Sequence, residues 1–121
     1  MKVLVVEDSA DVGLVTIEYL NELEHDAVLV PDAEQALALL PETTFDAVMT
    51  DIRLPGMDGL QLTRLIKLAR GAKQVPIIAV SANNTPKSIQ EAFESGCDGY
   101  ITKPVDTRTF ATDVHQYLDR E

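Results

Sequence analysis

Short apolar runs recur along the chain, most of them rich in Val, Ile and Leu. They cover residues 2–6, 27–30, 46–50, 76–80 and 98–102. Short runs without strict alternation of polar and apolar residues are typical of strands that are covered on both faces. The pattern therefore predicts five buried β-strands.

The segments between these runs repeat their apolar residues every three or four positions, as amphipathic helices do. The stripes are Val12, Val15, Tyr19, Leu20 and Leu23; Ala33, Ala36, Leu37 and Leu40; Leu62, Leu65, Ile66 and Ala69; Ile89, Ala92, Phe93 and Gly96; and Phe110, Val114, Tyr117 and Leu118. Helix-start signals are Ser9, Asp32, Thr85 and Asp106, and helix-stop signals are Pro41, Gly71 and Gly96. Each predicted helix has one apolar face.

Strand and helix thus alternate five times, without an internal repeat or a low-complexity linker. This alternation predicts an α/β fold, a doubly wound parallel sheet with right-handed crossovers and helices on both faces. For five strands the common order is the flavodoxin-like 2-1-3-4-5. The length of 121 residues suits a single domain over residues 1–121, without a separate catalytic or DNA-binding module.

Four of the apolar runs stop at polar residues that could carry chemistry. Glu7 and Asp8 follow the first run, Asp51 the third, Ser81 the fourth and Lys103 the fifth. Because the carboxyl ends of parallel strands share one edge of a sheet, these side chains should meet there, where ligands bind. With strands about 4.8 Å apart, Ser81 would lie one strand from Asp51. Lys103 would have to reach across about two strand spacings, which a long side chain can do.

Three carboxylates at one edge repel one another unless a cation lies among them. At an effective dielectric constant near 20, each pair about 4 Å apart repels by roughly 4 kcal/mol. A hard divalent ion with oxygen ligands suits this cluster, and Mg²⁺ is the natural choice. Glu7, Asp8 and Asp51 carry three negative charges. One Mg²⁺ and Lys103 would neutralise them and leave a site ready for an anion.

The overall charge balance is acidic, with 20 Asp and Glu against 10 Lys and Arg and a formal net charge of -10. Direct nucleic-acid binding is not expected, because it depends on an excess of clustered Lys and Arg. No apolar run approaches the roughly 18 to 20 residues that cross a bilayer, and the first residues lack a signal-peptide pattern. We therefore expect a cytoplasmic protein without membrane contact. The single cysteine, Cys97, is predicted to pack in the interior. His25 and His115 are predicted to lie on the surface.

The motifs at the strand ends resemble those of the receiver domain of two-component response regulators, over essentially the whole chain. They are Glu7-Asp8, Asp51 in Asp-Ile-Arg-Leu-Pro-Gly-Met-Asp-Gly, Ser81-Ala82, and Lys103-Pro104 in Gly-Tyr-Ile-Thr-Lys-Pro. Each motif alone is weak, but four of them in order, each at the end of a strand, are specific. The 2-1-3-4-5 order is itself known from this family, so its agreement is not independent support.

The resemblance implies that Asp51 accepts a phosphoryl group from a phosphohistidine on a sensor histidine kinase or a phosphotransfer protein. The implied Mg²⁺ ligands are Asp8, Asp51, the backbone carbonyl of Arg53 and, through water, Glu7. The implied phosphoryl-binding groups are Ser81, the backbone N–H of Ala82, and Lys103. A cis peptide bond between Lys103 and Pro104 would aim the lysine inward. The chain would not be an enzyme beyond its own phosphorylation and dephosphorylation.

The same resemblance implies a switch formed by Ser81 and Tyr100. Ser81 would move toward the phosphoryl group, and Tyr100 would turn inward to fill the vacated space. A downstream protein would then bind the surface of the fourth helix, fifth strand and fifth helix. Arg53 and Asn83 occupy the positions that tune attack by water. Because neither is a carboxylate, we predict slow to moderate self-dephosphorylation.

Other functions fit parts of the pattern. A haloacid-dehalogenase-like phosphatase also uses a strand-end aspartate and Mg²⁺, but it needs a second aspartate where Arg53 stands, and a cap domain. A pseudo-receiver scaffold remains open, although every site position holds a workable residue. A nucleotide-binding flavodoxin-like domain would need a glycine-rich loop after the first strand. The cognate kinase, the output, the oligomeric state and any attachment to a larger protein also remain open.

Overall fold

The computed structural model describes residues 1–70, 75–105 and 107–118. Within them, strands and helices alternate as the apolar pattern predicted. The elements are β1 (Lys2–Val6), α1 (Ala10–Glu22), β2 (Asp26–Val30), α2 (Ala33–Leu39), β3 (Ala47–Asp51), α3 (Gly59–Arg70), β4 (Ile77–Ser81), α4 (Pro86–Glu94), β5 (Gly99–Thr102) and α5 (Thr107–Leu118). Every strand boundary falls within one residue of its prediction. Two of the expected helix signals, Gly71 and Asp106, lie outside the described residues.

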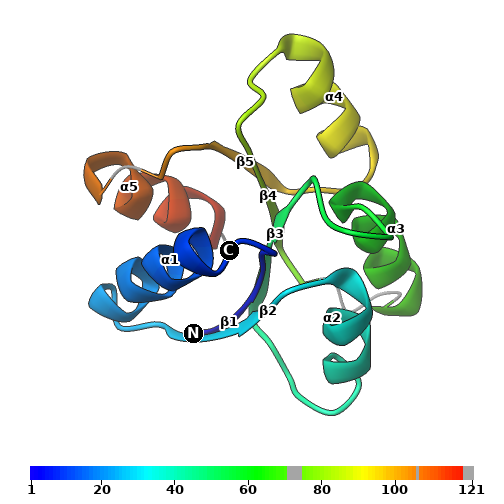
Figure 1. Cartoon of the computed structure of the whole chain (residues 1–121), viewed down its shortest axis with the longest axis horizontal. Helices are drawn as coiled ribbons and strands as arrows, with labels where there is room; N and C mark the ends of the chain where they lie inside the picture. The colour runs from blue at the N-terminus through cyan, green and yellow to red at the C-terminus, as the bar shows by residue number, and fades with distance from the viewer. Residues whose placement is uncertain (71–74, 106, 119–121) are drawn as a thin grey trace.

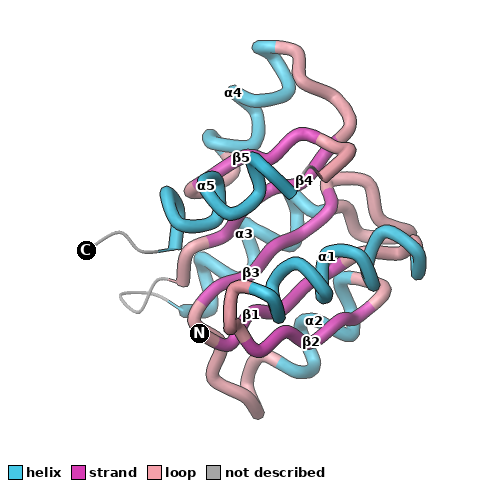
Figure 2. The backbone as a smooth tube through the Cα atoms, turned by 90° about the vertical axis from the view of Figure 1, so that its left-hand side faces the viewer, coloured by secondary structure: helices cyan, strands magenta, loops and turns pink. Residues whose placement is uncertain are grey.

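The strands form one parallel sheet in the order β2-β1-β3-β4-β5, which confirms the predicted topology. Helices α1 and α5 cover one face, and α2, α3 and α4 cover the other (Figure 1). The view in Figure 2 shows the same two layers, with α1 and α5 in front of the sheet. The sheet is therefore covered on both sides, and the carboxyl ends of its strands share one edge.

Alternate residues of each strand enter opposite apolar layers, because side chains along a strand point to opposite faces. On β1, Leu4 and Val6 pack beneath α2, α3 and α4, whereas Val3 and Val5 pack beneath α1 and α5. All four residues are buried in these layers, with at most 3 % of their surface exposed. This double burial explains why the strand sequences are continuously apolar.

Local side-chain bonds fix where the helices begin. The predicted caps Ser9, Asp32 and Thr85 each accept a backbone N–H from the first turn of α1, α2 and α4. Asp58 caps α3 in a reciprocal arrangement, in which its Oδ1 accepts the N–H of Gln61 at 2.8 Å and the Gln61 Oε1 accepts the N–H of Asp58 at 3.0 Å. Such caps satisfy N–H groups that have no partner inside the helix.

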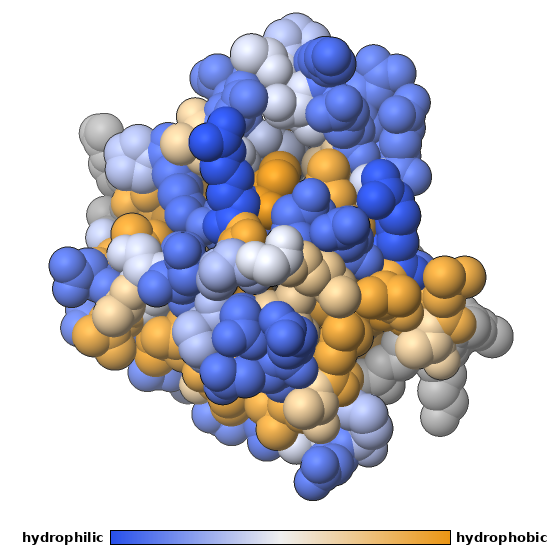
Figure 3. Space-filling model, turned by 45° about the vertical axis from the view of Figure 1, so that its right-hand side comes forward, coloured by the Kyte–Doolittle hydropathy of each residue, from blue (hydrophilic) through white to orange (hydrophobic). Residues whose placement is uncertain are grey.

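The predicted helical stripes are only partly buried, which corrects the sequence interpretation. Val15 and Leu65 are each 40 % exposed and Phe93 is 44 % exposed. On α1 the predicted Leu20 is buried, and the other buried positions, Gly13 and Thr16, lie outside the predicted stripe. A helix lying on a sheet buries a narrow strip, so apolar residues at the edges of a stripe stay accessible. Apolar surface interrupts the hydrophilic surface on the side where α2, α3 and α4 lie (Figure 3).

Three further expectations concern single residues and membrane spans. Cys97 is buried as predicted, with its Sγ 3.6 Å from the hydroxyl of Thr63, and burial raises the pKa of its thiol. The histidine prediction is wrong in part, because His25 is half-buried and its ring centroid lies 6.4 Å from that of His115. In the described ranges, no helix has the length and apolar character needed to cross a bilayer.

Candidate functional site

The predicted site residues meet at the carboxyl edge of the sheet. Asp51 and Ser81 are the last residues of the adjacent strands β3 and β4, and Glu7 directly follows β1. These three are between 5 and 8 % exposed, so the site is recessed. Asp8, next to Glu7, is exposed to solvent. The fold therefore brings Glu7 and Ser81 to one edge of the sheet, although they are 74 positions apart in the sequence.

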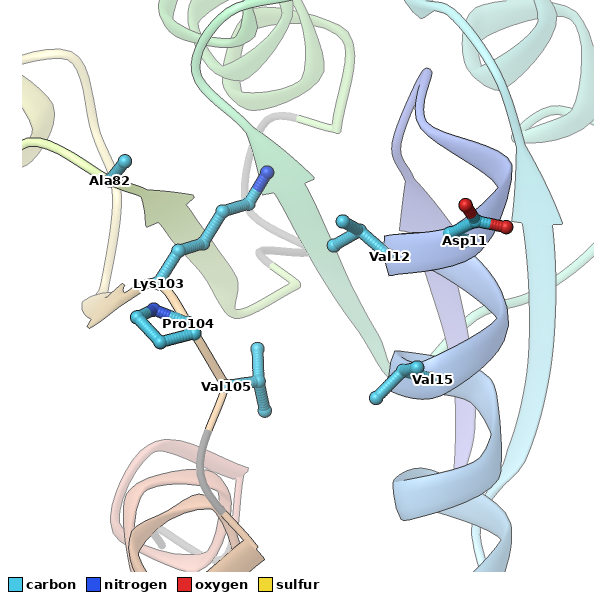
Figure 4. Close-up of a pocket in the computed structure, with 7 residues that line it drawn as sticks. All are labelled: Asp11, Val12, Val15, Ala82, Lys103, Pro104 and Val105. Atoms are coloured by element: carbon cyan, nitrogen blue, oxygen red, sulfur yellow. The ribbon is translucent and has the colours of Figure 1, made fainter.

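Lys103 reaches the carboxylates from the end of β5. Its Nζ lies 2.8 Å from Oε1 of Glu7 and 3.0 Å from Oδ2 of Asp51. The side chain extends away from Pro104 along the mouth of the site (Figure 4), and the Lys103–Pro104 peptide bond is cis. The two ion pairs show that one lysine crosses the spacing of two strands, as the strand order required.

Electrostatics keep this lysine charged. Burial alone would lower the pKa of Lys103, but its hydrogen bonds to Glu7 and Asp51 outweigh burial and raise the pKa. Burial raises the pKa of Glu7, opposed by hydrogen bonds from Lys103 and from the N–H of Ser9. With the carboxylate of Asp8, the site has three acidic side chains around one cation.

The carboxylates are arranged to hold a metal ion. One oxygen from each of Glu7, Asp8 and Asp51 lies within 4.8 Å of the other two. Their formal charge with Lys103 is -2, which a divalent cation would neutralise. Hard oxygen donors in this number suit Mg²⁺. The backbone of Arg53 lies beside the cluster, because its N–H donates to Oδ1 of Asp51 at 3.2 Å.

A depression of about 350 Å³ opens over Asp51. It is lined by Asp51, Arg53, Ser81, Ala82, Asn83 and Lys103. All six were singled out from the sequence. Arg53 and Asn83 are exposed at its rim, so both can contact water that enters. The space is large enough for a tetrahedral anion and is lined by the residues that carry the Asp51 carboxylate, the lysine and the hydroxyl of Ser81.

The two expected switch residues converge on Asn83. The Oγ of Ser81 accepts the N–H of Asn83 at 3.1 Å, and the hydroxyl of Tyr100 donates to the backbone carbonyl of Asn83. Tyr100 is half-buried and packs against the core under α2, α3 and α4. Asn83 thus links the hydroxyl of Ser81 to the aromatic ring on β5.

An apolar cleft of about 510 Å³ borders the depression and was not predicted. Its walls come from α1 and from the chain after β5, and its lining is Asp11, Val12, Val15, Ala82, Lys103, Pro104 and Val105 (Figure 4). Val12 and Val15 face Pro104 and Val105 across the cleft instead of entering the core. A sign of it was present in the sequence, since α1 carries more apolar residues than a helix on a sheet can bury.

Comparisons with known proteins agree with this geometry. A family model described as response regulator receiver domain matches residues 3–115. The chain is 32 % identical over 107 residues to the sensory/regulatory protein RpfC of Xanthomonas campestris pv. campestris, which covers 87 % of this chain and 15 % of that protein. It is 30 % identical over 121 residues to the chemotaxis protein CheY-3 of Vibrio cholerae, covering 99 % of this chain and 93 % of that one.

Solved structures give the same picture. The receiver domain of the sensor histidine kinase PA1611 from Pseudomonas aeruginosa, with a magnesium ion coordinated in its active site cleft, is 28 % identical with a TM-score of 0.88, covering 98 % of both chains. The chemotaxis response regulator CheY4 of Vibrio cholerae is 25 % identical with a TM-score of 0.90, covering 97 % of this chain and 98 % of that one. The similarity thus extends over short and long proteins, and this chain spans only a small part of RpfC.

Proposed function

Because the chain belongs to the response regulator receiver domain family, we propose that Asp51 takes a phosphoryl group from a phosphohistidine on a partner protein. The partner is a sensor histidine kinase or a histidine phosphotransfer protein. The observation that carries this proposal is the placement of Lys103, with its Nζ 3.0 Å from Asp51 and 2.8 Å from Glu7 at the edge of a three-carboxylate cluster. This arrangement combines a recessed carboxylate, an ion-paired lysine and room for an anion.

The transfer needs positioning and charge neutralisation more than covalent help from the protein. An oxygen of Asp51 attacks phosphorus while the bond from phosphorus to the histidine nitrogen breaks, which leaves an acyl phosphate on Asp51 and a neutral imidazole once a proton is taken up. Lys103 neutralises one phosphoryl oxygen, and the hydroxyl of Ser81 with the N–H of Ala82 binds another. Asp8, Asp51 and the carbonyl of Arg53 would hold Mg²⁺, with Glu7 acting through water, and the bound ion supplies charge neutralisation.

The donor approaches through the apolar cleft beside the site. A protein that brings a phosphohistidine to Asp51 must cover the mouth of the depression, and this mouth shares Ala82 and Lys103 with the cleft. Val15 lines this cleft and is 40 % exposed, so it offers apolar contact area there. Burial of such surface contributes about 25 cal/mol per Å².

Phosphorylation then shifts the switch. It replaces the single charge of Asp51 by about two, so the formal charge of the Mg²⁺-loaded site moves from 0 to about -1. Ser81 turns its hydroxyl toward the phosphoryl group, the loop at Asn83 follows, and Tyr100 follows the carbonyl to which it is bonded. The surface of α4, β5 and α5 changes as a result, and a downstream protein reads it.

The expected conversion is incomplete. Moving a two-state element from 1:99 to 99:1 requires about 5.5 kcal/mol of preference for one state. One or two hydrogen bonds to a charged phosphoryl group contribute roughly 1.5 to 3 kcal/mol each. Active and inactive forms should therefore coexist after phosphorylation.

Radiolabelling tests the proposal. Wild-type protein should take up radiolabelled phosphate from a phosphorylated histidine kinase when Mg²⁺ is present and should take up no label when a chelator removes the Mg²⁺. The variant Asp51→Asn should take up no label under either condition. Asp58→Asn is the matched control, because asparagine also caps helices and Asp58 lies outside the carboxylate cluster. If the Asp51→Asn variant still takes up label, a residue other than Asp51 is the acceptor.

The lifetime of the label tests the roles of Arg53 and Asn83. Neither residue can act as a carboxylate that orients water, so we expect loss of label over minutes or longer. A half-life of a few seconds would contradict this assignment. A chromogenic phosphate ester should show no turnover, whereas turnover would support the phosphatase alternative.

A further inference from the structure

Gly59, the first residue of α3, lies against the backbone of Asp51. A Cβ built at residue 59 would lie 2.2 Å from the carbonyl oxygen of Asp51, 3.0 Å from its carbonyl carbon and 2.9 Å from the Cα of Ile52. The N–H of Gly59 also donates to the carbonyl of Ile52 at 2.8 Å. The atoms in the way belong to the backbone, so they cannot rotate aside as a side chain could.

Backbone conformation does not explain why glycine stands here. Gly56 and Gly96 have φ values of 74° and 112°, in the region that favours glycine, whereas Gly59 has no positive φ. Glycine is required at residue 59 because the backbone of Asp51 and Ile52 leaves no space for a Cβ atom.

Both sides of this contact are held in place. On the α3 side, the hydroxyl of Thr63 donates to the carbonyl of Gly59 at 2.8 Å, and Asp58 caps the first turn. On the β3 side, the hydroxyl of Thr50 donates to the carbonyl oxygen of Asp51 at 3.0 Å. A methyl group at residue 59 must therefore push two anchored segments apart.

We propose that Gly59 is a positioning residue, whose missing side chain sets where Asp51 stands relative to Lys103 and the other carboxylates. Asp51 is the last residue of its strand, so a displaced peptide carries its carboxylate with it. The consequence for phosphorylation rests on the proposed function, whereas the consequence for the carboxylate cluster does not.

The test compares Gly59→Ala with Gly99→Ala. A Cβ at residue 99 would lie 2.5 Å from the ring of Tyr117 at the opposite end of the sheet, so Gly99→Ala introduces a side-chain clash far from the carboxylate cluster. Both are made together with Glu24→Gly, because Glu24 has a φ of 65° and glycine there should stabilise the fold. Urea titration identifies the conditions under which each protein is folded.

Three readouts are then taken on folded protein. They are the Mg²⁺ dissociation constant by calorimetry, the NMR signal of the Lys103 ammonium group, and the labelling rate with acetyl phosphate as a small donor. A misplacement of about 1 Å costs on the order of 10- to 100-fold in rate, so Gly59→Ala should lose that much while Gly99→Ala labels at the rate of its Glu24→Gly parent. The Mg²⁺ affinity and the Lys103 signal should change in Gly59→Ala only.

The readouts separate two kinds of failure. If Gly59→Ala has the same Mg²⁺ affinity, Lys103 signal and labelling rate as its Glu24→Gly parent, the positioning role is overturned. A Gly59→Ala protein that stays unfolded in the Glu24→Gly background would overturn it too, because the glycine would then serve the fold and not the placement. If the parent protein itself takes no label, the proposed function fails, and the Mg²⁺ and NMR measurements still decide the role of Gly59.

Discussion

Two lysines bind carboxylates at opposite ends of the sheet, and only one of them belongs to a site with unbalanced charge. At the carboxyl edge, Lys103 lies 2.8 Å from Glu7 and 3.0 Å from Asp51. At the amino edge, Lys67 of α3 lies 2.9 Å from Asp98, the residue that precedes β5. The two lysines are similarly recessed, with 18 % and 20 % of their side-chain surface exposed.

The difference lies in what else surrounds each pair. Lys67 also donates to the carbonyl of Val75 at 3.2 Å, and the Asp98 oxygen also accepts the N–H of Ile77 at 2.9 Å. One cation and one carboxylate balance there, and backbone groups take the remaining bonds. Around Lys103 the three acidic side chains leave a formal charge of -2 and open onto a depression. Excess charge and an adjacent depression distinguish the ion pairs of Lys103 from that of Lys67, whereas burial and ion pairing do not.

The largest effect expected from this comparison is on phosphorylation. Lys103→Met should lower the labelling rate by about 10²- to 10³-fold, because a preorganised donor to the phosphoryl oxygens is lost. Lys67→Met should label at the wild-type rate under conditions where it is folded. Initial rates of labelling from the same phosphorylated kinase measure both. Equal losses in the two variants would break the comparison.

A smaller effect is expected on folding at the amino edge. Lys67→Met should reduce the free energy of unfolding by about 1 to 3 kcal/mol, because Asp98 is left partly buried without its cation. Urea unfolding followed by circular dichroism measures it. Restored stability in the double variant Lys67→Met, Asp98→Asn would show that the lone carboxylate causes the loss. No loss in the single variant would mean that solvent already screens this pair.

The carboxylates at the two ends of the sheet should also differ in how they contribute to stabilisation of the fold by Mg²⁺. At a free Mg²⁺ concentration ten times its dissociation constant, binding to the folded state adds about 1.4 kcal/mol to the free energy of unfolding. Asp8→Asn should abolish most of this gain, whereas Asp98→Asn should keep it, since only Asp8 belongs to the cluster. Thermal unfolding with and without a chelator measures the difference. An equal gain in both variants would place the ion elsewhere.

The smallest effect concerns pH in the absence of metal. Burial raises the pKa of Glu7 in the folded state above its ordinary value of 4.5, so its ionised form opposes folding above the raised pKa. This penalty disappears as the pH falls through the raised pKa toward 4.5, where folded and unfolded states both bind the proton. Wild-type protein should therefore gain stability relative to Glu7→Gln on acidification in a chelator. A constant difference between pH 8 and pH 4 would show that Glu7 keeps an ordinary pKa.

Sequence reasoning predicted the residues at the strand ends because the rules that place them are local. An apolar run predicts a buried strand, the polar residue after it marks the carboxyl end, and parallel strands bring such ends to one edge. Glu7, Asp51, Ser81 and Lys103 follow from these rules, and the resemblance to receiver domains added their roles. The caps at Ser9, Asp32 and Thr85 were also predicted, since each bonds within its own helix turn.

Contacts between distant elements were decided only by the tertiary structure. The cleft at Val12 and Val15 depends on how α1 sits beside the chain after β5, and the bond from Tyr100 to Asn83 depends on the path of a loop. At residue 59 it is close packing against the backbone of Asp51 that requires glycine. Periodicity along a chain records which way a side chain faces, but the distance between two elements is set by all the side chains packed between them. The sequence by itself thus determined the order of the elements and the identity of the reactive groups, and packing decided their separations.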